Sequence, residues 1–196
     1  MDQEIAIRLG VPVGQAAGAT RLYCEAFVDK LAPFLGAAER AAPFLAASFA
    51  GDRVFVAHRG GAVVGIAGFK LAGKGLFAPS FRQFLGEYGL SALVRWAGLA
   101  LLERKEEPHC LLMDGIAVAA DARGRGLGTR LLGAIEDHAR SLGKTSIRLD
   151  VIDTNPGARR LYERLGFKAE RTVGVGPLRP LFPFRATTTM KKTLAP

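Results

Sequence analysis

The sequence predicts an α/β fold in which about seven strands form a mixed sheet flanked by helices. Residues 110–173 alternate strand, glycine-rich loop, helix, strand, helix and strand. Hydrophobic residues make up 49% of the 196 residues, which is enough for a substantial core in one domain. A long helical stretch separates the third strand from the fourth. We therefore expect a single domain over residues 1–196 with a helical insertion between those strands.

The first half of the chain carries three strand signals and two helical stretches. Strands show alternating or continuous apolar residues, and helices show apolar residues at a spacing of 3.6. In order, we expect a strand at 5–9, helices within 13–35 and 37–49, and strands at 52–58 and 62–69. Arg59-Gly60-Gly61 joins the last two strands and is typical of a hairpin.

The second half begins with a loop at 73–79 and a mostly helical segment at 80–106. An apolar stripe at helical spacing runs along this segment, formed by Leu93, Trp96, Leu99 and Leu102. After it we expect a strand at 110–118, a helix from the glycine loop to Ser141, a strand at 145–152, a helix opened by Asn155-Pro156 and closed by Gly166, and strands at 167–173 and 185–194, joined by the proline-rich stretch 176–183.

The chain is basic, with 27 Lys and Arg against 18 Asp and Glu and a formal charge of +9. The excess is largest from Arg159 onward, where nine basic residues face two Glu. A basic cleft attracts an anionic cofactor, an acidic substrate or nucleic acid. Because the basic residues are scattered and lack interleaved aromatics, we do not expect a nucleic-acid partner.

Several functional classes are excluded by what the sequence lacks. The N-terminus Met1-Asp2-Gln3-Glu4 is acidic and has no secretory pattern, and no apolar run reaches eighteen residues. We therefore expect a cytoplasmic protein with no membrane partner. Cys24 and Cys110 should be buried and reduced. No pair among the three histidines has zinc-ligand spacing, so we expect no metal.

The most informative motif is Arg123-Gly124-Arg125-Gly126-Leu127-Gly128-Thr129, which lies between an apolar strand and a helix. Glycines let the backbone approach a ligand closely, and the first helical turn presents unpaired N–H groups. These donors, the helix dipole and the neighbouring arginines, Arg130 included, favour a pyrophosphate. A dinucleotide loop would need Gly-x-Gly-x-x-Gly early in a βαβ unit, and the final spacing here does not match it.

A second motif follows about thirty residues later, from Asn155 to Phe167. Its pattern Asn-x-x-Ala-x-x-Leu-Tyr-x-x-x-Gly-Phe, in register with Arg123-x-x-Gly126-x-Gly128, resembles the GNAT superfamily of acyl-CoA-dependent N-acetyltransferases. The resemblance covers roughly residues 113–167. It implies a mostly antiparallel sheet, acetyl-CoA as co-substrate and a cofactor-binding core at about residues 110–170.

The resemblance also implies which residues hold the cofactor. Backbone N–H groups of the glycine loop would surround the pyrophosphate, and the strand Ile116 to Val118 would pair with the pantetheine arm. Asn155 is either a helix cap alone or also a cofactor contact, and Ala158 is small where the cofactor passes. The expected cofactor-binding residues are Ile116, Ala117, Val118, Arg123, Gly124, Arg125, Gly126, Leu127, Gly128, Thr129, Asn155, Ala158 and Tyr162.

Two side chains are candidates for catalysis. In many family members the tyrosine at the position of Tyr162 protonates the departing thiolate; the alternative is a tyrosine that only packs its ring. Asp114, at the expected turn into Gly115-Ile116, matches a position where several members carry a catalytic Glu or Asp. Its alternative is a solvated or strand-capping carboxylate. His109 is expected to be structural rather than part of an acceptor cleft.

We therefore expect an N-acetyltransferase that moves acetyl from acetyl-CoA to a small-molecule amine by direct attack in a ternary complex, since no cysteine lies in either motif. A protein lysine or N-terminus as acceptor, and a non-catalytic acyl-CoA-sensing regulator, are the alternatives. Acceptor determinants should lie in the first helices, in 80–106 and in 176–183. The Trp96 stripe belongs either to the core, to an acceptor pocket or to a homodimer contact.

Overall fold

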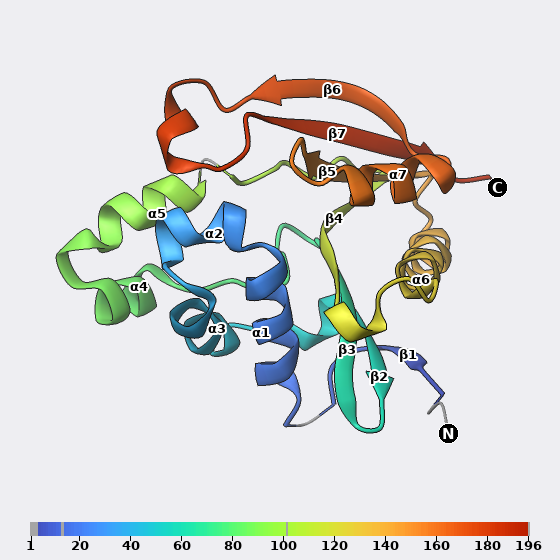
Figure 1. Cartoon of the computed structure of the whole chain (residues 1–196), viewed down its shortest axis with the longest axis horizontal. Helices are drawn as coiled ribbons and strands as arrows, with labels where there is room; N and C mark the ends of the chain where they lie inside the picture. The colour runs from blue at the N-terminus through green and yellow to red at the C-terminus, as the bar shows by residue number, and fades with distance from the viewer. Residues whose placement is uncertain (1–3, 13, 101, 196) are drawn as a thin grey trace.

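A seven-stranded sheet runs through the molecule (Figure 1). The protein is seen in a computed structural model that describes residues 4–12, 14–100 and 102–195. The strands lie in the order β1-β2-β3-β4-β5-β7-β6, and among the described strands only β4 and β5 pair in parallel. Their bounds are β1 Ala6–Leu9, β2 Val54–Arg59, β3 Ala62–Phe69, β4 Cys110–Val118, β5 Ser146–Ile152, β6 Lys168–Gly174 and β7 Ala186–Thr193. The predicted α/β fold with seven strands, most of them antiparallel, is confirmed.

Helices cover the sheet from both sides, with α1 to α5 on one side of β4 and α6 and α7 on the other (Figure 1). The helix α1 packs against β3 and β4, whereas α6 packs against β2, β3 and β4. The bounds are α1 Ala16–Ala26, α2 Val28–Leu35, α3 Ala38–Ala46, α4 Phe81–Tyr88, α5 Ala92–Ala100, α6 Leu127–Ser141 and α7 Pro156–Arg164. The helices α4 and α5 occupy the connection between β3 and β4.

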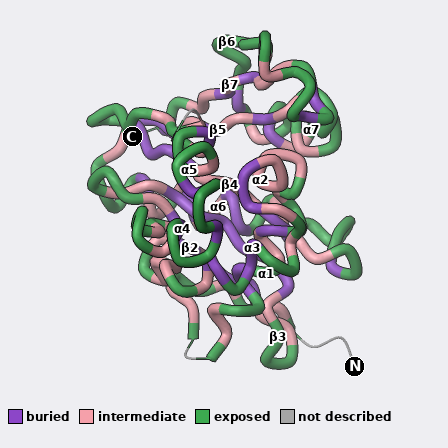
Figure 2. The backbone as a smooth tube through the Cα atoms, turned by 90° about the vertical axis from the view of Figure 1, so that its left-hand side faces the viewer, coloured by how far each residue is buried: buried purple, intermediate pink, exposed green. Residues whose placement is uncertain are grey.

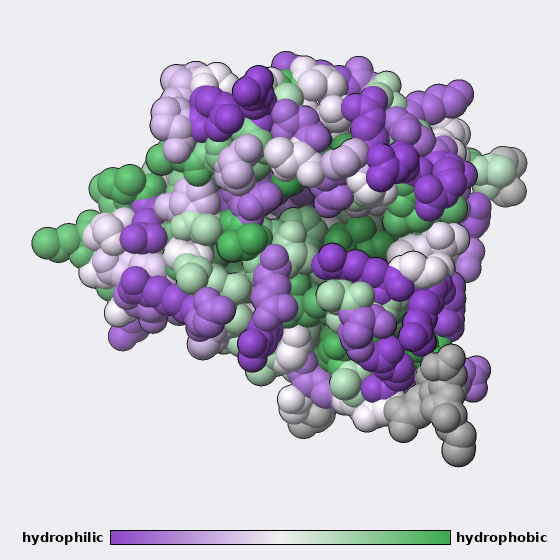
Figure 3. All heavy atoms as spheres, viewed as in Figure 1, coloured by the Kyte–Doolittle hydropathy of each residue, from purple (hydrophilic) through white to green (hydrophobic). Residues whose placement is uncertain are grey.

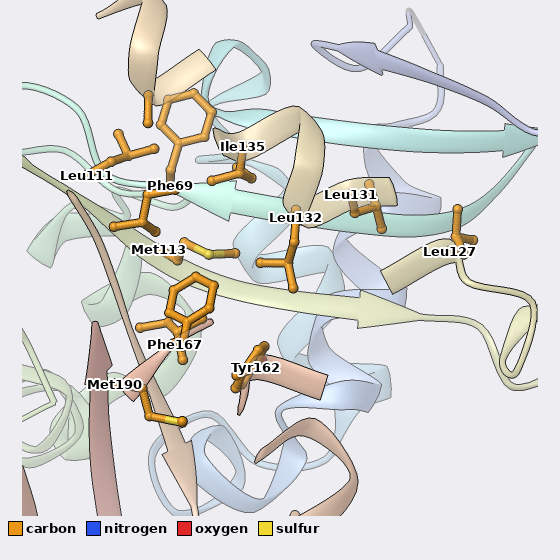
Figure 4. Packing of buried hydrophobic residues seen from close by; sticks show 14 of the residues in the cluster. Phe69, Leu111, Met113, Leu127, Leu131, Leu132, Ile135, Tyr162, Phe167 and Met190 are labelled. Carbon is orange, nitrogen blue, oxygen red and sulfur yellow. The ribbon is translucent and has the colours of Figure 1, made fainter. Parts of the chain in front are cut away.

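The largest buried cluster lies between the sheet and α6 (Figure 4). Apolar residues of α6 recur every three or four positions, so one face of the helix is buried in the cluster. Buried stretches of chain gather around β4 in the middle of the molecule, and the loop ends are exposed (Figure 2). Members of the cluster include Phe69, Leu111, Met113, Leu127, Leu131, Leu132, Ile135, Tyr162, Phe167 and Met190.

The predicted helices and strands are present, with local differences in the first half of the chain. The helical stretch within 13–35 forms two helices that meet at Phe27. Arg59 pairs with Ala62 as the last residue of β2, so the hairpin turn consists of Gly60 and Gly61 alone.

The segment 80–106 is mostly helical, as predicted, but it forms separate helices. Gly89, with φ of 55°, ends α4, and the next helix is described only to Ala100. The stretch 176–183 contains a short 3-10 helix, Gly176–Leu181, in place of an irregular loop.

The residues Met1 to Gln3, Val13 and Leu101, which some of the predicted features include, lie outside the described part of the chain. Within the described part of the chain, no helix combines the length and the apolar character needed to cross a membrane.

Candidate active site

The strands β4 and β5 separate part-way along the sheet. They pair only where Cys110, Leu111 and Leu112 face Ser146, Ile147 and Arg148. Beyond that point β4 continues beside β3, and β5 continues beside β7. In an unbroken parallel ladder Asp114 and Asp150 would be neighbours. Both carboxylates therefore lie at the start of a gap in the sheet.

A β-bulge sets the position of Asp114. Phe69 pairs with Met113 and Gly68 with Gly115, so Asp114 is the extra residue on β4. The sequence placed Asp114 at a turn, and this was wrong: the residue lies inside the strand. The turn-like appearance of Asp114-Gly115 reflects the bulge, which re-aims a side chain without ending the strand.

Arg104 joins the two strands where they separate. One guanidinium nitrogen lies 3.0 Å from Asp150 Oδ2, and the other donates to the Met113 carbonyl at 3.3 Å. That carbonyl has no partner on β5, so the guanidinium satisfies an otherwise open strand edge. Lys70 Nζ in turn donates to the Arg104 carbonyl at 3.4 Å, which holds this segment against β3.

The end of β4 has an open backbone edge toward the gap. Ala119 N–H donates to Val64 on β3, and in an antiparallel ladder the alternate residues face the other way. Ile116 and Val118 therefore turn their backbone groups toward the gap, where the Val118 carbonyl accepts from Arg123 Nε at 3.0 Å. The strand predicted to pair with pantetheine has the open edge that such pairing needs, while Ala117 pairs with β3.

The glycine loop leads from β4 into α6. Gly124 and Gly126 have φ of 75° and 73°, and a Cβ added at either would meet no atom within 4 Å. Gly126 caps α6 without a side-chain hydrogen bond. The N–H groups of Leu127, Gly128 and Thr129 in the first turn therefore lack intrahelical acceptors. This open helix end has the anion-binding geometry that the sequence predicts.

The arginines near the loop differ in their contacts. Arg123 lies on the surface and contacts β4 through the Val118 carbonyl described above. Arg130 donates to the Ile5 carbonyl at 2.6 Å and so ties the start of the chain to α6. Arg123 and Arg125 are both exposed beside the loop, and their contacts with a cofactor stay predictions.

The helix α7 lies against the start of α6. Asn155 Oδ1 accepts a hydrogen bond from Ala158 N at 3.0 Å, so the predicted cap is confirmed. A Cβ on Gly128 would lie 3.0 Å from Leu161 Cδ2, and glycine thus lets the two helices approach. Cofactor contacts of Asn155 and Ala158 stay predictions.

Tyr162 is buried on the α7 side of the sheet, in the core cluster with Phe167 (Figure 4). The two ring centroids are 5.9 Å apart. Its hydroxyl makes no hydrogen bond with any described residue, so it has a free donor. Burial raises the pKa of Tyr162, which keeps the phenol protonated at neutral pH.

Asp114 is held by a backbone donor. Its Oδ2 accepts from Leu76 N at 2.5 Å. Burial raises the pKa of Asp114, and the Leu76 hydrogen bond and the charge of Arg104 oppose that rise. Burial raises the pKa of the neighbouring Tyr23, and the negative charge of Asp114 raises it further.

A cavity of about 880 Å³ opens at the gap, and its wall includes Asp114 and Asp150. The rest of the wall comes mainly from α1 and α2, from the loop 70–79, from the segment 96–104 and from the stretch 173–187. The three regions in which we expected acceptor determinants thus meet around one cavity. Figure 3 shows hydrophobic residues in a hollow near the centre of the face in view, with hydrophilic residues around it.

Only part of the apolar stripe in the segment 80–106 lines this cavity. Trp96, Leu99 and Leu102 line it, whereas Leu93 is 66% exposed on the surface. Among the described residues, neither Tyr162 nor His109 belongs to the cavity wall. Asp114 therefore lines the cavity, whereas Tyr162 lies in the core cluster.

Sequence reasoning singled out only Asp114 among the charged residues of this wall and missed six others, namely Lys30, Lys70, Lys74, Glu103, Arg104 and Asp150. A carboxylate in the apolar strand signal at 145–152 was a usable hint for Asp150. Lys30 and Arg104 carried no such signal, because they lie in segments without a motif and reach the site only through tertiary packing.

Residues 19–167 match the family model described as the acetyltransferase (GNAT) family. Over 61 residues the chain is 39% identical to the protein named "probable N-acetyltransferase camello" of Xenopus tropicalis and to an uncharacterized N-acetyltransferase of Schizosaccharomyces pombe. This stretch is 31% of the present chain but only 28% and 37% of those two proteins.

The fold is similar to that of yncA from Salmonella typhimurium, whose structure was solved with its cofactor acetyl-CoA. The TM-score is 0.63 at 18% identity, and the superposition covers 97% of this chain and 94% of the other. At this level of identity the likeness concerns the fold.

Proposed function

The chain belongs to the acetyltransferase (GNAT) family, and we propose that it transfers the acetyl group of acetyl-CoA to the amine of a small molecule, by direct attack in a ternary complex. The observation that carries this proposal is the cavity at the gap between β4 and β5, with Asp114 in its wall. We propose further that residues 1–196 act as one acetyltransferase domain, with a cofactor-binding core at about residues 110–170.

The residues on the α6 side of the gap fit CoA. Gly124 and Gly126 leave open space beside the helix end, which suits a pyrophosphate. The edge of β4 at Ile116 and Val118 offers backbone groups to the amides of a pantetheine arm, and the Val118 carbonyl there also accepts from Arg123 Nε. When bound, acetyl-CoA supplies an acyl group activated as a thioester. The likeness in fold to yncA, solved with that cofactor, supports this assignment.

In the proposed step the amine nitrogen attacks the thioester carbonyl carbon, so a C–N bond forms and the C–S bond breaks. Asp114 accepts the proton that the amine loses, and Tyr162 donates its phenol proton to the leaving thiolate. The products are the acetylated amine and free CoA. The raised pKa of Asp114 makes it a stronger base than an ordinary aspartate, and Tyr162, whose pKa is also raised by burial, carries its phenol proton at neutral pH.

Direct transfer is supported by the state of the cysteines. Cys24 and Cys110 are both buried and free, and burial raises the pKa of the Cys24 thiol to about 12. A thiol of that kind is a poor nucleophile at neutral pH. A small acceptor is supported by the cavity volume of about 880 Å³, within the range of small-molecule sites.

The test is thiol release from acetyl-CoA across a panel of small amines, a lysine-containing peptide and a peptide with a free N-terminus. We expect acceptor-dependent release with at least one small amine, saturable and inhibited by free CoA. Asp137→Asn, which changes a carboxylate that is 82% exposed on α6, is a matched control for Asp114→Asn and should keep full activity. Release with the peptides alone would indicate a protein acceptor. Tight acetyl-CoA binding without any release would indicate a sensor.

A further inference from the structure

Two charged residues of the cavity wall, Asp150 and Lys30, each have a polar atom without a hydrogen-bond partner among the described residues. Asp150 Oδ1 is buried and has no hydrogen-bond partner, although Oδ2 of the same carboxylate pairs with Arg104. A buried carboxylate oxygen without a donor is costly, because water cannot solvate it. This oxygen therefore needs an N–H or O–H donor from a bound molecule.

Lys30, on α2, is the positive counterpart. Its ammonium group makes no ion pair or hydrogen bond with any described residue, although Asp150 and Arg104 lie near enough to act on its charge. Burial lowers the pKa of Lys30 to about 8, which means that the charged form is poorly solvated there. An anion beside Lys30 would restore the charged form.

Apart from its charged residues, which also include Lys70, Lys74 and Glu103, the cavity wall is largely apolar and aromatic. Phe34 packs against α5 so closely that a Cβ on Gly98 would lie 2.2 Å from its ring. Phe34 and Phe182 meet with ring centroids 5.9 Å apart, which closes this end between α2 and the loop before β7. The aromatic residues of the wall include Phe27, Phe34, Phe84, Trp96, Phe182 and Phe184.

A molecule that binds in this cavity must donate a hydrogen bond to Asp150 Oδ1, carry a negative charge near Lys30 and present an apolar group to the aromatic end. We propose, on the basis of the acetyl transfer proposed above, that the acceptor is an α-amino acid with a large apolar side chain. Its carboxylate binds Lys30, its amine lies at Asp150 and Asp114, and its side chain fills the aromatic end. Acetylation of the α-amine then yields an N-acetyl amino acid and free CoA.

Three acceptors in the thiol-release assay test the role of the carboxylate and the role of the aromatic side chain separately. L-phenylalanine carries all three features, phenethylamine lacks only the carboxylate, and L-alanine lacks only the ring. We expect kcat/KM for L-phenylalanine to exceed both others by about 100-fold or more, because unpaired polar groups and an unfilled apolar site each discriminate strongly. Equal or better turnover of phenethylamine would overturn the role of the carboxylate. Equal turnover of L-alanine would overturn the role of the aromatic end.

Lys30→Met tests the residue itself. We expect kcat/KM for L-phenylalanine to fall about tenfold or more, since a charge-assisted hydrogen bond is lost, and the preference over phenethylamine to shrink with it. Lys168→Met removes an exposed lysine of β6 and should leave both values unchanged. An unchanged preference in Lys30→Met would contradict the proposal, and the substrate comparison on the native chain does not depend on the folding of the variant.

A binding measurement separates this inference from the proposed function. Calorimetry of L-phenylalanine against the protein with saturating CoA should give a signal that Lys30→Met abolishes. If other amines are acetylated while L-phenylalanine neither binds nor reacts, the inference fails and the acetyltransferase function stands. If no amine is acetylated, the proposed function fails, and absence of L-phenylalanine binding in the same samples would overturn the inference as well.

Discussion

Asp114 combines a buried carboxylate, one short hydrogen bond from Leu76 and a neighbouring guanidinium. As the proposed base it must be ionised, so activity should rise with pH through a pKa that lies above the usual range for aspartate. We expect Asp114→Asn to lower kcat/KM by about 10²–10⁴-fold, the usual contribution of general base catalysis, and to remove the acidic limb of its pH profile. A profile of unchanged shape would exclude Asp114 as the base.

The same substitution should stabilise the fold at neutral pH. Because the pKa is raised in the folded state, stability is fully present below the unfolded pKa and is lost as pH rises through the folded value. Asn keeps an acceptor for Leu76 N–H but carries no charge. Thermal unfolding of both proteins should therefore show a higher Tm for Asp114→Asn at pH 7, with the difference closing at acidic pH.

Tyr162 has a dual environment, with its ring packed beside Phe167 and its hydroxyl unpaired among the described residues. Tyr162→Phe keeps the packing and removes the acidic proton. We expect kcat to fall by about 100-fold or more with little change in Tm. A kcat within about twofold of the native value would mean that the phenol is not the general acid.

At the scale of elements, the turn into α6 depends on backbone that favours glycine. Gly126→Ala places a side chain at φ of 73°, which costs about 1–2 kcal/mol and re-aims the N–H groups of the helix end. We expect the KM for acetyl-CoA to rise about tenfold or more, since small misplacements at a binding site are expensive.

Gly133→Ala is the matched control on the same helix. A Cβ there also meets nothing within 4 Å, but Gly133 lies mid-helix and is not among the positive-φ glycines. Alanine should stabilise α6 by up to about 1 kcal/mol without changing the KM for acetyl-CoA. Equal KM values for the two variants would contradict the assignment of the loop.

Arg104 acts as a link between elements, since it bonds to Met113 on β4 and Asp150 on β5. Arg104→Met leaves the carboxylate of Asp150 without any ion pair, and we expect a loss on the order of 3 kcal/mol in the free energy of unfolding. Asp150→Asn in the same chain should recover much of that loss, which denaturant titrations of the single and double variants can measure. Arg159→Met breaks an exposed pair with Glu163 on α7 and should change stability by less than about 0.5 kcal/mol.

For the whole molecule, ligand binding and folding are linked. CoA at about 100 times its Kd should add about 2.7 kcal/mol to the free energy of unfolding. For a chain of 196 residues this corresponds to a rise in Tm of roughly 5–10 °C in a thermal-shift assay. AMP at the same concentration lacks the pyrophosphate and pantetheine arm and should give a much smaller rise. Equal shifts with CoA and AMP would argue against the glycine loop as a pyrophosphate site.

Local signals predicted most of the fold. The 3.6-residue spacing of Leu127, Leu131 and Ile135 gave α6, and Asn155-Pro156 gave the start of α7. Both are decided by residues close together in the chain. The bulge at Asp114 was not predictable in this way, because it arises from the pairing of β4 with β3.

The cavity also required the three-dimensional structure. Lys30 and Asp150 are 120 positions apart in the sequence, and only packing of α2 against the gap in the sheet makes them neighbours. The acetyl-CoA side of the site could be predicted from the sequence because its residues form two compact motifs. The acceptor side is assembled from single residues of several elements, and no motif marks it.

The short pairing of β4 and β5 divides the reaction between two consecutive portions of the chain. The portion that ends at Val118 builds β1 to β4 and contributes Asp114, and the portion that begins at Ser146 builds β5 to β7 and contributes Asp150 and Tyr162. The proposed reaction centre is thus the seam between two half-sheets, and neither half contains a complete set of reacting groups. The molecule can therefore be active only when the half-sheets β1 to β4 and β5 to β7 have packed together in the correct register.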